Sequence, residues 1–98
     1  MTASVTVIDE GTLAVQGDLN FQSVTTLWES AVKLSAGHTQ LNIDLTNVKR
    51  SDSSGVALLV EWLRLAQENQ QEVRFVNTPA QMRAIIRVVE LEQILPLD

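Results

Sequence analysis

A polar corner between two apolar segments constrains the fold of this chain more than any other feature. Residues 41–45 alternate as a strand, and residues 56–68 repeat their apolar side chains at helical spacing. The corner, residues 50–55, lies between them and reads RSDSSG. A second alternating segment, residues 72–76, follows the helix, so the two strands should be parallel. The corner then lies at the carboxyl end of a parallel strand, where ligands and partners of open α/β sheets gather.

The rest of the chain adds a hairpin and two more helices. Residues 5–8 and 12–16 read as strands joined by a turn at Gly11, and residues 17–20 break that pattern. Residues 21–35 predict an amphipathic helix with Phe21 on its apolar face, and the last helix is expected to have Thr78 as its cap and Pro79 at its first position. The predicted order is β-β-α-β-α-β-α. We expect a single α/β domain over residues 1–98, with a mixed sheet and helices packed mainly on one face.

Composition excludes several classes of protein. The 7 basic and 12 acidic residues give a net charge of −5, and the basic side chains form no patch of the kind that binds nucleic acid. The absence of cysteine excludes disulfides and thiolate metal sites. No apolar run approaches the ~20 residues of a membrane span, and the first residues lack a signal-peptide pattern. These observations predict a soluble, cytoplasmic protein that does not insert into the membrane.

The second helix is apolar over an unusually wide arc. A helix that packs one face against a sheet needs a stripe only a little over about 100° wide. Leu58, Trp62 and Leu65 lie on a flank beyond that stripe. This flank could pack on a neighbouring helix, or it could form a partner surface centred on Trp62, because tryptophan is enriched at interface hot spots. The sequence leaves both interpretations open.

Nothing in the sequence points to catalysis. The only histidine, His38, lies in a predicted turn far from the corner. Asp52 and Ser53 are adjacent at a helix start and have no third group to orient them, unlike a nucleophile and its base. Gly55 stands alone, without a glycine-rich phosphate loop, and the acidic residues match no metal-binding pattern. We therefore predict no enzymatic activity, no cofactor and no metal site. In the simplest structural interpretation, Ser53 or Ser54 caps the helix.

The corner resembles the motif of the STAS domain family, which includes anti-sigma-factor antagonists. The similarity lies in the strand 43–45, the segment 52–55 and the Val/Leu-rich helix that follows, and residues 17–20 are similar to a turn of that family. For antagonists of partner-switching circuits, the resemblance implies that a partner serine kinase, the anti-sigma factor, phosphorylates Ser53. A phosphate adds a charge of roughly −1.5 to −2, which would disrupt an interface that accepts a neutral hydroxyl.

A narrower resemblance is to MlaB-like STAS subunits of the Mla phospholipid-transport ABC complex. The residues that carry it are Leu27, Trp28, Glu29, Ile43, Asp44, Leu45, Val48, Arg50, Asp52, Gly55, Ala57, Leu58 and Leu59. This resemblance implies docking on the cytoplasmic ATPase subunit, peripheral to the inner membrane, in support of ATPase assembly and activity. Ser54 departs from the pattern, because glycine is frequent there in MlaB-like chains.

The transporter subunit is our first functional hypothesis, and the phosphorylation-switched antagonist is the alternative. Both predict protein binding through the corner and the flank of the second helix. The predicted partner-binding residues are Asp52, Ser53, Ser54, Gly55, Leu58, Trp62 and Leu65, with Ser53 as the switch.

Overall fold

The structure, a computed structural model, describes residues 3–98 and contains one four-stranded mixed sheet. Its strands are β1 (Ser4–Asp9), β2 (Thr12–Leu19), β3 (Gln40–Ser51) and β4 (Glu72–Val76), and they lie in that order across the sheet. β1 pairs antiparallel with β2, and β2–β3 and β3–β4 are parallel pairs. The predicted element order and mixed sheet are therefore confirmed.

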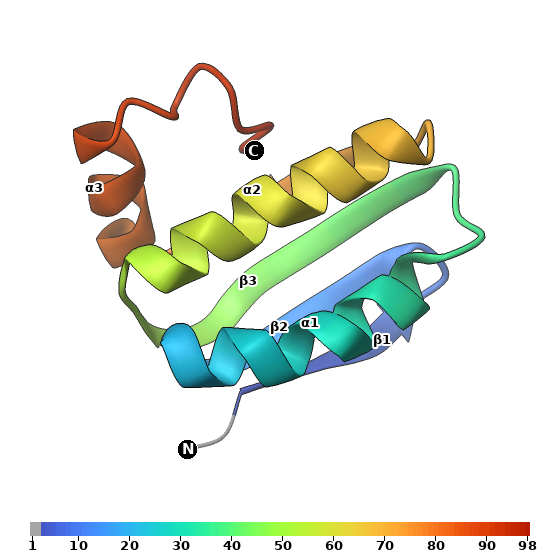
Figure 1. Cartoon of the computed structure of the whole chain (residues 1–98), viewed down its shortest axis with the longest axis horizontal. Helices are drawn as coiled ribbons and strands as arrows, with labels where there is room; N and C mark the ends of the chain where they lie inside the picture. Colours follow the sequence, from blue (N-terminus) through green and yellow to red (C-terminus); the bar gives the residue numbers. More distant parts are fainter. Residues whose placement is uncertain (1–2) are drawn as a thin grey trace.

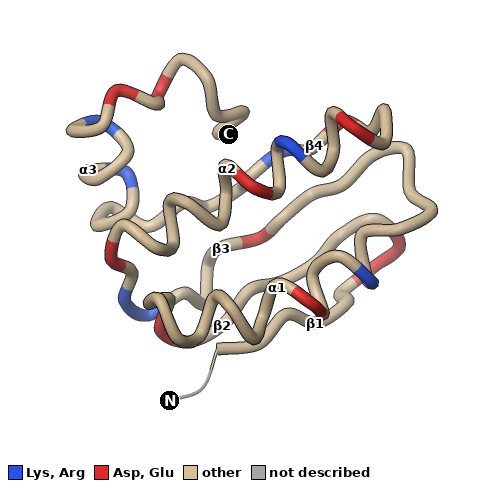
Figure 2. The backbone as a smooth tube through the Cα atoms, in the orientation of Figure 1, with Lys and Arg blue, Asp and Glu red and all other residues tan. Residues whose placement is uncertain are grey.

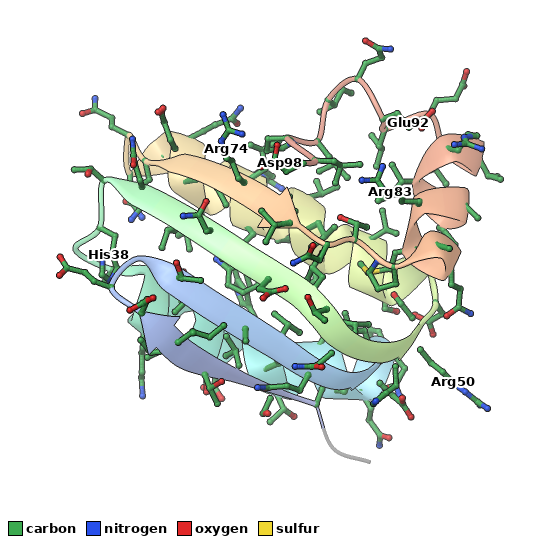
Figure 3. The ribbon with its side chains drawn as sticks, turned by 180° about the vertical axis from the view of Figure 1, so that it is seen from behind. His38, Arg50, Arg74, Arg83, Glu92 and Asp98 are labelled. Atoms are coloured by element: carbon green, nitrogen blue, oxygen red, sulfur yellow. The ribbon has the colours of Figure 1, made fainter. Side chains whose placement is uncertain are left out.

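Three helices accompany the sheet: α1 (Phe21–Ser35), α2 (Ser53–Glu68) and α3 (Ala80–Val88). α1 and α2 lie side by side across one face, and α3 lies beside the beginning of α2 (Figure 1). The opposite face of the sheet carries no helix (Figure 3). This arrangement confirms the prediction of helices mainly on one face. No helix within residues 3–98 is both long and apolar enough to cross a membrane.

The core lies between the covered face of the sheet and the two long helices. Alternate residues of each strand point into it, as the period of two requires. Burial of each large apolar side chain contributes about 1.5–3 kcal/mol relative to exposure. The large side chains with almost no exposed surface are Leu13, Val15, Leu19, Leu41, Ile43, Leu45, Leu59, Trp62, Phe75, Met82 and Ile86.

β2 and β3 are longer than the sequence predicted. Alternation indicated that these strands end at residues 16 and 45, but they continue to Leu19 and Ser51, where those two residues pair with each other. Two irregularities in the β2–β3 register allow glycine and polar residues to continue the ladder without regular alternation. β2 and β3 are also parallel neighbours connected through α1, so the fold has two β-α-β units where the sequence analysis recognised one.

The start of α3 also differs from the prediction. Pro79 is the N-cap, with an extended backbone and no capping hydrogen bond from its side chain, so the helix begins one residue later, at Ala80. Thr78 was expected to be the cap. Instead it is buried, and its hydroxyl has no hydrogen-bond partner among the described residues.

The segment after α3 returns to the sheet and covers the outer side of β4. The Phe75 amide donates to the Pro96 carbonyl at 3.0 Å, and the Asp98 amide donates to the Phe75 carbonyl at 2.9 Å. Arg74 pairs with the Asp98 carboxylate at 3.1 Å, and Figure 3 shows the two side chains together. One edge of the sheet is thus occupied by the chain itself.

Candidate functional site

The corner that joins β3 to α2 is capped by its aspartate. The Asp52 carboxylate accepts a hydrogen bond from the Ser54 amide at 2.8 Å, and the Asp52 carbonyl accepts one from the Gly55 amide at 3.1 Å. An N-cap of this kind stabilises a helix by about 1 kcal/mol. The prediction that Ser53 or Ser54 caps the helix is therefore wrong, because the helix starts one residue earlier than a serine cap requires.

Two further hydrogen bonds tie the corner to other elements. The Asp52 amide donates to the Leu19 carbonyl at the end of β2, at 3.1 Å. The Ser51 amide donates to the side-chain oxygen of Gln81 in α3, also at 3.1 Å. Because β2, β3 and α3 all hold this short segment, the start of α2 is fixed relative to the sheet.

Gly55 allows α2 to approach the ends of β2 and β3. A Cβ atom on Gly55 would overlap the Ser51 hydroxyl oxygen and would lie 3.1 Å from the Leu19 Cβ. Gly55 is buried, so its role is to position the corner. Its predicted place among the partner-binding residues stays a prediction, and as a buried residue it presents little surface of its own.

Ser53 is the first residue of α2 and is exposed. Its hydroxyl makes no hydrogen bond within the part of the chain that the structure describes, because Asp52 does the capping. Asp52 is exposed beside it, and Ser54 is half-buried. The corner therefore presents an uncommitted hydroxyl at a helix N-terminus, where the helix dipole favours negative charge.

The flank of α2 that contains Trp62 is part of the core. Trp62 has no exposed surface, and its indole nitrogen donates to the Ser35 hydroxyl of α1 at 2.8 Å. Its ring meets the ring of Trp28 edge to face, with centroids 6.1 Å apart and an interplanar angle of 86°. Leu58 is also buried, and Leu65 is half-buried against the same core. The interpretation that this flank packs on a neighbouring helix is correct, and the predicted partner surface centred on Trp62 is wrong.

A different row of α2 faces outward. Ser53, Ala57 and Glu61 follow one another at intervals of four residues, and all three are exposed. An open groove of about 360 Å³ lies on the α1 side of this row, and a second groove of about 320 Å³ lies on the α3 side. The first groove is lined by Phe21, Val24, Thr25, Trp28, Ser54, Ala57, Leu58 and Glu61, and the second by Ser53, Val56, Ala57, Val60, Glu61, Ile85, Val89 and Leu91.

Two large apolar side chains are exposed along these grooves. Phe21 of α1 is 79% exposed, and Val89, directly after α3, is 47% exposed. We call Ser53, Ala57, Glu61, Phe21 and Val89 the docking surface. The sequence analysis assigned Phe21 to the apolar face of its helix and did not recognise Val89 as a surface residue. The available signal was position, since both residues lie at helix ends, where the neighbouring elements cover less of the surface.

Neither the histidine nor a cluster of metal-binding side chains from residues 3–98 lies at the corner. His38 and Arg50 lie at opposite ends of the sheet in Figure 3, so the only histidine is remote from the corner. Figure 2 shows acidic and basic residues scattered over several elements. Within residues 3–98, no three side chains of the metal-binding types form a cluster that could hold an ion.

The one carboxyl group with a clearly altered pKa lies on the uncovered face of the sheet. The Thr46 hydroxyl donates to the Asp44 carboxylate at 2.6 Å and the Thr46 amide at 3.0 Å, and together they hold the pKa of Asp44 below its usual value. Asn77 adds a third, longer hydrogen bond at 3.2 Å, and partial burial opposes the shift. Asp44 belongs to the middle of β3, so this perturbation is separate from the docking surface.

Comparison with known families agrees with this architecture. A family model described as "Mlab, STAS domain" matches residues 6–96. The chain therefore belongs to the STAS domain family. No curated protein was found that matches this sequence.

Several solved structures share the fold. The unphosphorylated anti-sigma factor antagonist SpoIIAA has a TM-score of 0.75 at 15% identity, over 99% of this chain and 86% of that one. A putative anti-sigma factor antagonist from Thermotoga maritima has a TM-score of 0.77 at 13% identity, with 95% and 82% covered. An anti-sigma factor antagonist from Mycobacterium paratuberculosis has a TM-score of 0.70 at 21% identity, with 98% and 83% covered. At these identities the similarity shows the fold.

Proposed function

We propose that this chain is a non-enzymatic subunit that binds the ATPase of an ABC-type phospholipid transport system of the Mla kind and supports its activity. The observation that carries the proposal is the docking surface, a row of small or polar side chains between two open apolar grooves. The family match, whose description names Mlab, supports this partner over others. In this role the protein works at the cytoplasmic side of the inner membrane through its partner, without inserting into the bilayer.

The shape of the docking surface fits a protein better than a small molecule. The row from Ser53 to Glu61 is about 12 Å long, at 1.5 Å per residue. The grooves beside it are open along their length, whereas small-molecule sites enclose most of their ligand. Apolar side chains of a partner could enter both grooves while its backbone crosses the row at Ala57, where the side chain is smallest.

A second candidate is an anti-sigma factor antagonist that is switched by phosphorylation of Ser53. The specific observation in its favour is the exposed Ser53 hydroxyl, which no hydrogen bond within residues 3–98 occupies. A phosphate there would stand beside the carboxylate of Asp52 and at the rim of the groove lined by Glu61. This added negative charge would oppose an interface that is otherwise apolar and uncharged at its centre.

Purification of the chain from its native host, at native expression level, distinguishes the two candidates. A stoichiometric ABC ATPase identified by mass spectrometry, with an ATPase rate that falls when this subunit is removed, supports the transport role. An anti-sigma kinase as partner, with phosphate on Ser53, supports the antagonist and contradicts the transport role. If neither partner binds, both candidates are wrong.

Substitution of Ser53 tests the docking surface itself. Ser53→Glu should weaken partner binding at least about tenfold, because a carboxylate would be buried in the interface without a counter-charge. Ser53→Ala is the matched control and should bind as the wild type does if the hydroxyl is only tolerated. Isothermal titration calorimetry measures both, and circular dichroism checks that each variant is folded. Normal binding by Ser53→Glu would remove the corner from the interface.

A further inference from the structure

The two edge strands of the sheet, β4 and β1, differ in whether another segment of the chain pairs with their outer side. The outer side of β4 is occupied by the C-terminal segment, through the hydrogen bonds between Phe75, Pro96 and Asp98. β1 is the other end of the strand order, and no strand within residues 3–98 pairs with its outer side. In Figures 1 and 3, β1 lies at the border of the sheet. Among residues 3–98, β1 is therefore the edge strand whose outer side no other strand pairs with.

Residues 4–8 of β1 carry no charge or proline that would protect an edge strand. Natural edges carry lysine, proline or inward-pointing charges, which prevent pairing with other chains. Residues 4–8 read SVTVI and contain no charge and no proline. Val7 is 56% exposed and Ile8 is 54% exposed, so two large β-branched side chains face solvent at this edge. A register irregularity, one of the features that can protect an edge, lies between Val7 and Asp9 at the end of β1, and residues 4–7 keep a regular register.

The sequence of this edge is self-complementary. We infer that two copies of this chain associate by antiparallel pairing of β1 with β1, with Thr6 of one copy opposite Thr6 of the other. In this register Val5 of each copy lies opposite Val7 of the other, because Val5-Thr6-Val7 reads the same in both directions. Pairs of β-branched residues directly opposite each other stabilise antiparallel strands. The association covers the exposed side chain of Val7 in both copies and joins two four-stranded sheets into one.

Pairing through β1 ends at two copies. A two-fold interface uses the same surface of both subunits and closes on itself. Growth into a longer assembly would need the outer side of β4, where the C-terminal segment already pairs at Phe75. The docking surface belongs to α1, α2 and the end of α3, with no residue from β1, so it stays accessible in both copies. The inference is independent of the proposed function.

Sedimentation velocity over a wide concentration range tests the association. The wild-type chain should show a monomer–dimer equilibrium, and Val7→Lys should weaken the dimer at least about tenfold, because each dimer would bury the charge twice. Val88→Lys is the matched control, since Val88 is an equally apolar side chain, 81% exposed, on α3. It should leave the dimer unchanged. A chain that stays monomeric up to millimolar concentration, or a dimer insensitive to Val7→Lys, overturns the inference.

Cysteine cross-linking tests the register, and the chain offers a clean background because it contains no cysteine. Thr6→Cys should form a disulfide-linked dimer under mild oxidation, since directly opposite residues have Cβ atoms about 4.5–5.5 Å apart. Ser4→Cys should cross-link far more slowly, because the two copies of residue 4 would be separated by roughly 14 Å along the strands. Both variants remove one side-chain hydrogen bond to Gln16, so they are matched in the native fold. Equal rates for the two variants would contradict the proposed register.

Discussion

The two sides of α2 differ in the size and burial of their side chains. On the side that faces α1, Trp62 is fully buried, with an edge-to-face contact to Trp28 and a hydrogen bond to Ser35. On the outward side, Ser53 and Ala57 are small and exposed, and the apolar grooves beside them are lined by α2 together with the neighbouring helices. The largest side chain of α2 thus stabilises the fold, and its smallest side chains form the centre of the docking surface.

The burial of Trp62 shows that a large aromatic side chain on an apolar flank need not mark an interface. Tryptophan is enriched at hot spots, but it is also the side chain that gains most from burial beneath a neighbouring helix. Small residues on an exposed row leave space for the side chains of a partner. The most exposed large apolar side chains along the two grooves are Phe21 and Val89, at the ends of two other helices.

The largest effect that separates the two sides of α2 is expected for Trp62→Ala. Loss of the buried ring should lower the free energy of unfolding by about 3–5 kcal/mol, as truncations of large core aromatics do. Phe21→Ala is the matched aromatic control and should change stability by no more than about 0.5 kcal/mol, because its side chain is exposed. Urea denaturation followed by circular dichroism measures both. A stable Trp62→Ala variant would contradict the assignment of Trp62 to the core.

A smaller loss is expected where α2 meets the ends of the strands. Gly55→Ala places a Cβ against the Ser51 hydroxyl and Leu19, and overpacking of this kind costs about 1–3 kcal/mol. The double variant Gly55→Ala/Ser51→Ala removes the hydroxyl oxygen, so it should regain part of this loss. Double-mutant analysis of urea denaturation gives the coupling between the two sites. If the changes in the free energy of unfolding of the two single variants simply add in the double variant, the contact between residues 51 and 55 is not the cause of the loss.

The outward row should affect binding without affecting stability. Ala57→Lys puts a long charged side chain between the two grooves and should weaken partner binding about tenfold, which corresponds to about 1.4 kcal/mol. Gln67→Lys introduces the same charge at an exposed position of α2 outside the docking surface and should bind normally. Calorimetric titration of both variants with the purified partner makes the comparison. Equal affinities would show that the partner does not cross α2 at Ala57.

The smallest effect on stability is expected for Asp44→Asn, on the uncovered face of the sheet. This position lies away from both sides of α2 and serves as a reference for them. The folded-state pKa of Asp44 is lowered from 3.8, so its carboxylate stabilises the fold above pH 3.8, and this contribution disappears as the pH falls through the folded pKa. Wild type should therefore lose its stability advantage over Asp44→Asn when the pH is lowered below 3.8. Urea denaturation across this pH range measures the difference. A difference that does not depend on pH would mean that the hydrogen bonds to Asp44 do not depend on its charge.

Periodicity in the sequence predicted the helices and strands well, but it did not predict where the long strands end or which elements pack against each other. The helix bounds at Phe21 and Ser35 and the strand at residues 72–76 follow directly from spacing and match the structure. The extension of β3 to Ser51 could not be predicted, since irregular register removes the alternation that marks a strand. The burial of Trp62 could not be predicted either, because the sequence shows that a flank is apolar but not which helix covers it. Asp52 was identified as part of the corner, but its role as the cap depends on a helix start that periodicity locates only to within a residue or two.

The attachment of the corner to three elements has a kinetic consequence. The hydrogen bonds of Ser51 and Asp52 to Gln81 and Leu19 hold Ser53 in one position before any partner arrives. A partner then meets a preformed surface and loses no free energy in ordering it, so association should be a single bimolecular step without a slow rearrangement. Differences in affinity among variants of this surface should consequently appear as differences in the lifetime of the complex.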